Sequence, residues 1–171
     1  MKYLIASLLV ALLAIPALAQ HNEEAQAAYK LAEREFNRQK YEEAMVHYDK
    51  AIEIDPAWVN AHLRRAFCLS MLKRYEDAIK DYDAVLAKQP ELIYALNSRG
   101  SALNKLERYD EAMDMCNQVL SLDKKNTEAY NNRGWAKEFT GDHEGACKDW
   151  KKSKSLGNEE AKIILKNTHC K

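Results

Sequence analysis

Two histidines and two cysteines near the end of the chain have the side chains of a metal site. His143 and Cys147 are four residues apart, and His169 and Cys170 are adjacent. Residues four apart on a helix share one face, and imidazole and thiolate groups are usual ligands of zinc. Adjacent residues point in different directions, so all four side chains would meet at one metal ion only in a distorted chain end. The two cysteines also offer the alternative of a disulfide bond.

Three arginines, Arg65, Arg99 and Arg133, recur at intervals of 34 residues. A guanidinium that is buried or half-buried needs an acidic partner, because an unpaired buried charge is costly. The regular spacing favours structural ion pairs over ligand binding by these side chains.

The period of 34 residues extends over most of the chain. The segment YEEAMVHYDKAIEIDP, which starts at Tyr41, returns as YEDAIKDYDAVLAKQP at Tyr75 and as YDEAMDMCNQVLSLDK at Tyr109. A degenerate copy, HEGACKDWKKSKSLGN, starts at His143. Apolar residues recur at steps of three and four, as amphipathic helices require, and no segment alternates with the period of a strand.

This period, with two helices in each unit, resembles the tetratricopeptide repeat (TPR). The family places a small residue on each first helix, a small and then an aromatic residue on each second helix, and a closing proline. Cys116 replaces the third aromatic residue, and Lys124 and Asn158 replace the last two prolines. The matching residues are Ala32, Ala66, Gly100 and Gly134, then Ala44, Ala78, Ala112 and Ala146, then Tyr48, Tyr82 and Trp150, and finally Pro56 and Pro90.

The resemblance implies an all-α fold, a right-handed superhelical α-solenoid of four helix pairs with a C-terminal capping helix. The cap is expected because the last repeat would otherwise expose its apolar side. We expect repeats at about 25–58, 59–92, 93–126 and 127–158 and the capping helix at about 158–169. The predicted helices span 23–39, 41–54, 57–73, 75–88, 91–107, 109–122, 126–140, 142–154 and 158–169.

Antiparallel helix pairs predict partners for the arginines, because a residue early in one helix faces a residue late in the other. This geometry places Arg65 near Asp81 and Arg133 near Asp149. For Arg99, the available acid, Asp114, is less well placed.

The same geometry favours a disulfide bond over a metal site. Cys147 is near the start of the last repeat's second helix, and Cys170 is at the end of the cap that should lie beside it. The bond would close a loop of about 23 residues and stabilise the fold by about 2–4 kcal/mol. Packing alone explains His143, which occupies the slot of three tyrosines. We expect no cofactor, and we interpret Cys68 and Cys116 as buried apolar residues.

The family's binding groove implies the candidate functional residues. First helices line the concave face of such an array, and rings and amides on that face suit peptide recognition. We expect Trp135 to point into this face rather than the core, because it follows Gly134 and a helix turns about 100° per residue. With Phe67, it is the strongest single candidate. The peptide-binding groove is predicted to comprise Tyr29, Phe36, Asn60, Leu63, Phe67, Met71, Tyr94, Asn97, Asn104, Asn131, Trp135 and Phe139.

One subtype of the family is disfavoured by the residues in its binding slots. TPR domains that bind chaperones hold a C-terminal carboxylate with lysine, asparagine and arginine side chains. The corresponding slots here hold Tyr29 and Glu33, then Arg64, then Asn97 and Ser101. The full cationic set is therefore not expected.

Residues 1–19 have the pattern of a secretory signal peptide. A basic residue, an apolar run and the sequence Ala17-Leu18-Ala19 occur in the expected order. We therefore predict export to the periplasm or the exterior, a mature domain at 20–171 and no membrane insertion after cleavage.

Composition narrows the classes of partner. The 26 basic and 26 acidic residues give no electrostatic footprint for nucleic acid or an anionic membrane. No enzyme motif is present, so we expect no catalytic activity. The sequence predicts a scaffold or adaptor that binds a peptide segment of another exported protein, with a metal or redox protein as the alternative. Homo-oligomers are compatible with this interpretation.

Overall fold

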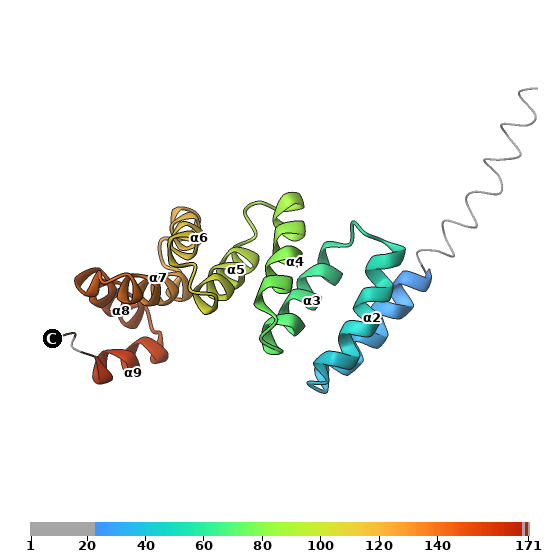
Figure 1. Ribbon diagram of the computed structural model, residues 1–171, viewed down its shortest axis with the longest axis horizontal. Coiled ribbons are helices and arrows are strands. Elements are labelled where there is room, and N and C mark those ends of the chain that lie inside the picture. The colour runs from blue at the N-terminus through green and yellow to red at the C-terminus, as the bar shows by residue number, and fades with distance from the viewer. Residues whose placement is uncertain (1–22, 169, 171) are drawn as a thin grey trace, which may run out of the picture. The chain divides into compact units, whose positions relative to one another are not determined.

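The computed structural model describes residues 23–168 and residue 170, so the predicted signal peptide and His169 lie outside the described part. The described chain forms helices joined by short turns and contains no strand. Residues 23–37 are helical, and eight labelled helices follow (Figure 1). They are α2 (Tyr41–Ile54), α3 (Val59–Met71), α4 (Tyr75–Lys88), α5 (Ile93–Lys105), α6 (Tyr109–Leu122), α7 (Thr127–Phe139), α8 (His143–Ser155) and α9 (Glu159–Asn167). This is the all-α solenoid fold predicted from the sequence.

The chain divides into two compact units, one ending at Leu72 and the other beginning at Lys73. In the described part of the first unit, helix 23–37, α2 and α3 enclose two buried clusters. One holds Ala32, Ala44, Tyr48 and Cys68, and the other holds three alanines, Ala28, Ala51 and Ala61. In the second unit, each helix from α4 to α9 contacts the next, and α5 also contacts α7. This serial contact, with small residues buried at the helix crossings, is how a repeat array forms its core.

The helices α2, α4 and α6 begin and end at the predicted residues. The helices that precede them end earlier than expected, because Gln39, Lys73 and Glu107 take left-handed backbone angles with φ of 60°, 60° and 61°. A left-handed residue cannot continue a right-handed helix. The corresponding position before α8 is Gly141, with φ of 89°, which is the glycine turn expected from the sequence.

Side-chain caps define the starts of the last three helices. The side chains of Asn126, Asp142 and Asn158 accept hydrogen bonds from the backbone N–H groups of Ala129, Gly145 and Ala161, respectively. Each bond satisfies an N–H that the helix itself leaves unpaired. Together these caps fix where α7, α8 and α9 begin.

Gly134 on α7 permits an unusually close approach by α8. A Cβ atom at this position would lie 2.5 Å from Nε1 of Trp150, whose side chain is fully buried. The fourth repeat thus packs a buried tryptophan directly against a glycine.

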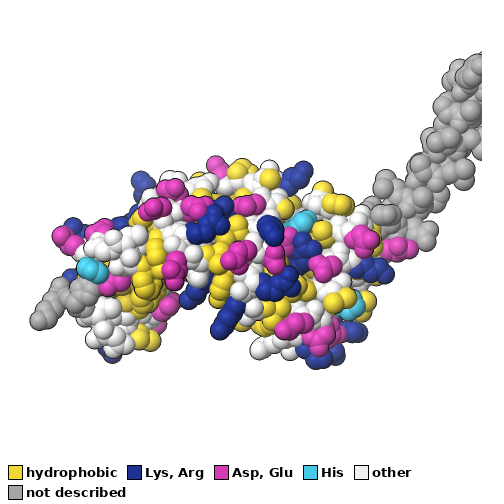
Figure 2. Space-filling view, viewed as in Figure 1, with side chains coloured by type: hydrophobic (Ala, Val, Ile, Leu, Met, Phe, Trp, Pro, Cys, Tyr) yellow, Lys and Arg dark blue, Asp and Glu magenta, His cyan; other side chains and the backbone are white. Residues whose placement is uncertain are grey.

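The surface of the described residues carries both signs of charge. Figure 2 shows Lys and Arg interspersed with Asp and Glu over the face in view. None of the described helices combines the length and the hydropathy that a membrane crossing requires.

Candidate functional site

The second unit contains a cavity of about 340 Å³ between residues of α5, α7 and α9. Four of the predicted groove residues, namely Asn104, Asn131, Trp135 and Phe139, line this cavity together. The remaining lining residues are Ser101, Lys105, Asn132 and Glu160. We call this set the groove cavity.

Two amides in the groove cavity have unused hydrogen-bond acceptors. Asn131 Nδ2 donates to Glu160 Oε2 at 3.0 Å, and Asn104 Nδ2 donates to the backbone oxygen of Asn132 at 2.8 Å. In both residues Oδ1 is buried and has no hydrogen-bond partner among the described residues. Hydrogen bonds within the chain therefore hold both amide side chains at the wall of the cavity.

The rings of Trp135 and Phe139 line the groove cavity, and Tyr109, outside it, extends the stack. The Phe139 ring lies between Tyr109, at a centroid distance of 5.2 Å, and Trp135, at 5.9 Å, and both pairs are stacked. Phe139 remains 62% exposed. Exposed aromatic rings are groups with which proteins commonly bind partners.

Trp135 corrects one expectation from the sequence. Its ring meets Trp150 edge-to-face at 5.2 Å and packs against the cluster of Ala146, Trp150 and Ile164. Trp135 therefore belongs to the core as well as to the groove cavity. The cause is Gly134, because its missing side chain lets the Trp150 ring approach α7.

The other predicted groove residues of the second unit lie outside the cavity. Asn97 is buried, and its Nδ2 donates to Asn126 Oδ1 at 2.9 Å and to Glu128 Oε2 at 3.3 Å. Tyr94 is 45% exposed but does not line the cavity.

In the first unit, the predicted groove rings pack against other rings. Tyr29 stacks on Trp58 at 4.7 Å, and Phe36 lies 5.3 Å from Phe67. Burial is the main cause of the raised pKa of Tyr29. Asn60 and Met71 are exposed and Leu63 is half-buried, and their binding role stays a prediction.

Glu33 occupies a slot where a carboxylate-binding TPR domain needs a hydrogen-bond donor or a cation. It accepts a hydrogen bond from the Tyr48 hydroxyl, and its Oε1 lies 3.4 Å from Arg64 Nε. The Arg64 guanidinium also lies over the Phe36 ring, 5.0 Å from its centroid. Arg64 is thus already engaged by an acid of this chain.

Sequence reasoning missed Lys105, Asn132 and Glu160. Glu160 comes from the capping helix, where Asn158 caps the helix and Glu160 lies two residues later. The same arrangement occurs at α7 with Asn126 and Glu128. This recurring Asn-x-Glu pattern was the available signal, since each acid accepts from an asparagine on the preceding first helix.

The recurrent arginines are anchored by acids. Arg133 bonds both oxygens of Asp149, at 2.7 and 2.8 Å, as predicted, and also donates to Asn117 Oδ1 at 2.7 Å. The bonds from Asp149 are the leading cause of the raised pKa of Arg133. Lys137 Nζ lies 2.8 Å from the same carboxylate.

Two arginine partners were not predicted. Arg99 pairs with Asp83 at 2.7 Å rather than with Asp114, and Arg65 pairs with Asp49 at 2.6 Å. Both partners lie on the second helix of the preceding repeat, whereas the prediction considered only the two helices of one repeat. The proposed pair Arg65–Asp81 involves both units and stays a prediction.

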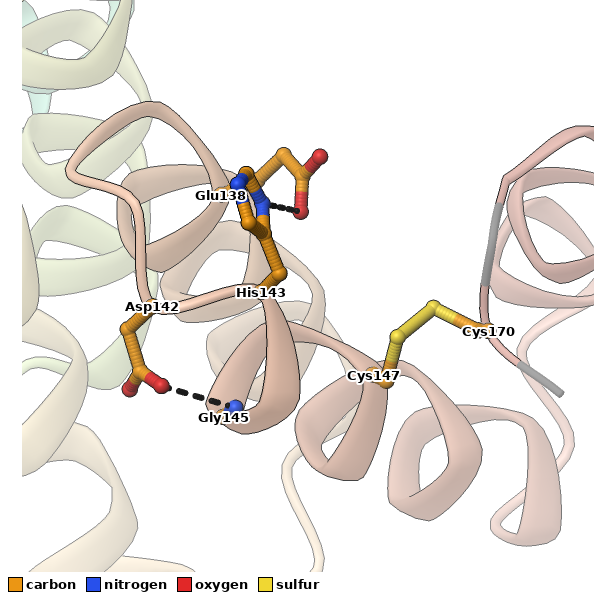
Figure 3. The surroundings of a disulfide bond; sticks show 6 residues. All are labelled: Glu138, Asp142, His143, Gly145, Cys147 and Cys170. Carbon is orange, nitrogen blue, oxygen red and sulfur yellow. Dashed lines mark hydrogen bonds and ion pairs between the residues drawn. A yellow bond between two sulfur atoms is a disulfide. The ribbon is translucent and has the colours of Figure 1, made fainter.

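Cys147 and Cys170 are joined in a disulfide bond, as predicted, with their Cα atoms 5.3 Å apart (Figure 3). Both thiols of the alternative metal site are consumed by this bond. Figure 3 shows the His143 ring beside Glu138, and its Nδ1 lies 3.0 Å from Glu138 Oε2. Among residues 23–168 and 170, no group of three or more His, Cys, Asp or Glu side chains is placed to hold a metal ion.

Family models place the chain in a known class of repeat proteins. A model described as TPR repeat matches residues 32–72, and models described as tetratricopeptide repeat match 59–92 and 93–126. Together they span 32–126, which is more than half of the chain. The chain therefore belongs to the tetratricopeptide repeat family. Proteins built from these repeats are typically non-enzymatic interaction scaffolds, and this chain has that class of fold.

Solved structures show the same fold. MamA 41-end from Desulfovibrio magneticus RS-1 has a TM-score of 0.74 and 22% identity, with 77% of this chain and 75% of that chain covered. The first TPR of Spaghetti (RPAP3), bound to the HSP90 peptide SRMEEVD, has a TM-score of 0.65 and 26% identity, with 69% and 94% covered. No curated protein matches the chain in sequence.

Proposed function

We propose that this chain is an exported scaffold that holds an extended segment of another exported protein in the groove cavity. The observation that carries the proposal is the cavity itself, whose wall places the side chains of Asn104 and Asn131 beside the exposed ring of Phe139. An extended peptide offers backbone N–H and C=O groups to side-chain amides and an apolar side chain to such a ring.

The groove cavity also restricts how the peptide would lie. Lys105 is exposed at its edge, and Glu160 on α9 is bonded to Asn131. The side chains of Asn104 and Asn131 come from α5 and α7, so one segment must cross both helices to contact both. We expect the apolar side chain to rest against Phe139, with Trp135 behind it.

A relative with a bound peptide supports this class of ligand. The first TPR of Spaghetti (RPAP3) is bound to an HSP90 peptide, SRMEEVD. In this chain, Tyr29 and Glu33 occupy the first slots of the family's carboxylate-binding set, and Glu33 already engages Arg64. We therefore propose that the ligand is an internal segment rather than a free C-terminus.

Two features support export. Residues 1–19 carry the signal-peptide pattern. The Cys147–Cys170 bond fits an oxidising compartment, such as the periplasm or the exterior. A chain expressed with its own first residues should be recovered without residues 1–19, and N-terminal sequencing of exported material would check this.

Peptide selection tests the groove directly. Peptides selected from a random library on the full mature chain should bind the Phe139→Ala variant more weakly by about 2 kcal/mol, the loss typical of an anchor residue. The matched control is Lys148→Ala, since Lys148 is exposed on α8, does not line the groove cavity and should leave binding unchanged.

Backbone N-methylation of the selected peptide tests the role of the two amides without altering the protein. Methylation removes one N–H donor at a time, so binding should fall sharply at the one or two positions that reach Asn104 and Asn131. If every methylated peptide bound as well as the parent, or if Phe139→Ala bound equally well, the peptide would not lie in the groove cavity.

A further inference from the structure

A second cavity lies at the C-terminal end of the second unit, between α8 and α9. Its volume is about 510 Å³, and it is separate from the groove cavity in all its lining residues. We call it the lysine pocket. It is lined by Lys151, Lys154, Ser155, Lys162, Leu165, Lys166 and Cys170.

The rim of the lysine pocket is strongly basic. Four of the seven lining residues are lysines, and no acidic side chain lines the pocket among the described residues. Lys162 pairs with Glu159 at 3.0 Å, whereas Lys154 and Lys166 are exposed and take part in no ion pair within the described chain. The equal totals of basic and acidic residues in the whole chain conceal this local excess.

Nearby acids leave Lys154 and Lys166 on the rim without an ion pair in the described chain. Asp149 on α8 is buried, and its carboxylate is already bonded to Arg133 and Lys137. Glu160 on α9 lines the groove cavity and accepts a hydrogen bond from Asn131. The positive field of the lysine pocket is therefore open to a ligand of opposite charge.

The floor of the lysine pocket is apolar and covalently fixed. Leu165 is half-buried, and Cys170 is held against the cluster of Ala146, Trp150 and Ile164. The bond from Cys147 on α8 ties Cys170, which follows α9, to this position (Figure 3). A ligand that fits must bring an apolar group to the floor and anionic groups to the rim.

We propose that the lysine pocket binds an acidic peptide segment, with one apolar side chain on Leu165 and the disulfide and flanking Asp or Glu carboxylates on Lys154 and Lys166. A flat membrane surface would meet the rim but not the floor of a concave pocket. The rim holds no arginine, the side chain whose planar fork suits bidentate phosphate recognition. The proposal does not depend on the function proposed for the groove cavity.

Fluorescence anisotropy with a labelled peptide of alternating Glu and Leu tests the proposal on the full mature chain. The matched peptide with Gln in place of Glu should not bind, and added salt should weaken the Glu peptide. The Lys154→Gln/Lys166→Gln variant should bind the Glu peptide about tenfold more weakly. A control with the same loss of charge, Lys125→Gln/Lys148→Gln, should retain the affinity, because neither lysine lines the pocket.

Each other outcome counts against the proposal. Equal affinity for the Glu and Gln peptides would mean that the pocket does not recognise the peptide's charge. Equal losses of affinity in the two lysine variants would mean that the peptide does not bind in the pocket. Binding to phosphatidylglycerol vesicles that is lost in Lys154→Gln/Lys166→Gln, without peptide binding, would assign the site to a membrane instead. Full competition by millimolar inorganic phosphate would assign it to a phosphate group.

The disulfide has its own test. The Cys147→Ser/Cys170→Ser variant should bind the Glu peptide more weakly than the parent while retaining its helical circular dichroism, because the floor is no longer fixed. Unchanged affinity in that variant would contradict the role assigned to the bond.

Discussion

Asp149 carries much of the charge balance inside the fourth repeat. Its side chain is 6% exposed, yet it faces Arg133 and Lys137, which are 20% and 22% exposed. A buried carboxylate with two cations around it is stable only as long as the set remains complete. The arginine series is therefore best understood as architecture.

Replacing Asp149 should destabilise the protein more than replacing Arg133 does. Asp149→Leu leaves two cations without their acid and should lower the free energy of unfolding by about 3–5 kcal/mol. Arg133→Leu should cost clearly less, because Lys137 remains beside Asp149. Urea unfolding followed by circular dichroism measures both, and two neutral variants would refute the ion-pair account.

The close approach at Gly134 gives a second prediction at this scale. Alanine normally stabilises a helix interior by about 1 kcal/mol relative to glycine. At Gly134 the new methyl would collide with the Trp150 ring, so Gly134→Ala should destabilise the protein by about 1–3 kcal/mol. Gly100→Ala is the control, because its Cβ would meet Met115 Cβ at 3.3 Å, a tight contact but a much milder one, so it should cost clearly less than Gly134→Ala. Melting temperatures that fall equally in the two variants would contradict this explanation.

A residue with positive φ lies in the turn that follows the first helix of each repeat. Residues Gln39, Lys73, Glu107 and Gly141 are spaced 34 residues apart, and all have positive φ. Only the last is a glycine, so the other three hold a conformation that costs an ordinary residue about 1 kcal/mol. The packing of the two helices that the turn joins therefore holds these residues in the left-handed conformation.

Exchanging residues at these turns should shift stability in opposite directions. Glu107→Gly should stabilise the protein, by up to about 1 kcal/mol, because it relieves the left-handed strain at an exposed site. Gly141→Gln should destabilise it by a similar amount, since Gly141 has φ of 89°. Chemical denaturation of both variants is the measurement, and destabilisation by Glu107→Gly would show that the strain is not significant.

Sequence periodicity predicted the helices better than their ends. The bounds of α2, α4 and α6 followed from the tyrosine that starts each repeated segment. The preceding helices end at left-handed turns at Gln39, Lys73 and Glu107. The residue types at these positions do not indicate a left-handed conformation, so the helix ends could not be predicted.

Contacts between repeats were the least predictable part of the candidate site. The Asp83 partner of Arg99 lies in another repeat, and Glu160 reaches the groove cavity from the cap. Trp135 contacts both the core and the groove cavity, because Gly134 leaves space for the Trp150 ring against which Trp135 packs. These details need the relative positions of helices from different repeats.

At the scale of the whole molecule, the four cysteines have two distinct states. Cys147 and Cys170 form the bond that fixes the end of the chain, while Cys68 and Cys116 are free and buried. Burial is the main cause that raises the pKa of each free thiol to about 12. The reactive thiolate is therefore scarce at neutral pH.

A thiol-specific reagent should detect this difference. The folded protein should show almost no reactive thiol at neutral pH, and denaturation without a reducing agent should expose two, those of Cys68 and Cys116. Peptide mapping should recover Cys147 linked to Cys170. Rapid labelling of Cys170 in the native protein would contradict this assignment.

The central claim is that the groove cavity of an exported scaffold holds a segment of another protein. Site-specific photo-cross-linking in the native host, with a photoreactive amino acid at position 139, tests this claim most directly. Position 148 is the control, because Lys148 is exposed on α8 and does not line the groove cavity. We predict that position 139 captures one defined segment of an exported protein and that position 148 does not. Identical adducts at both positions, or none at position 139, would contradict the account.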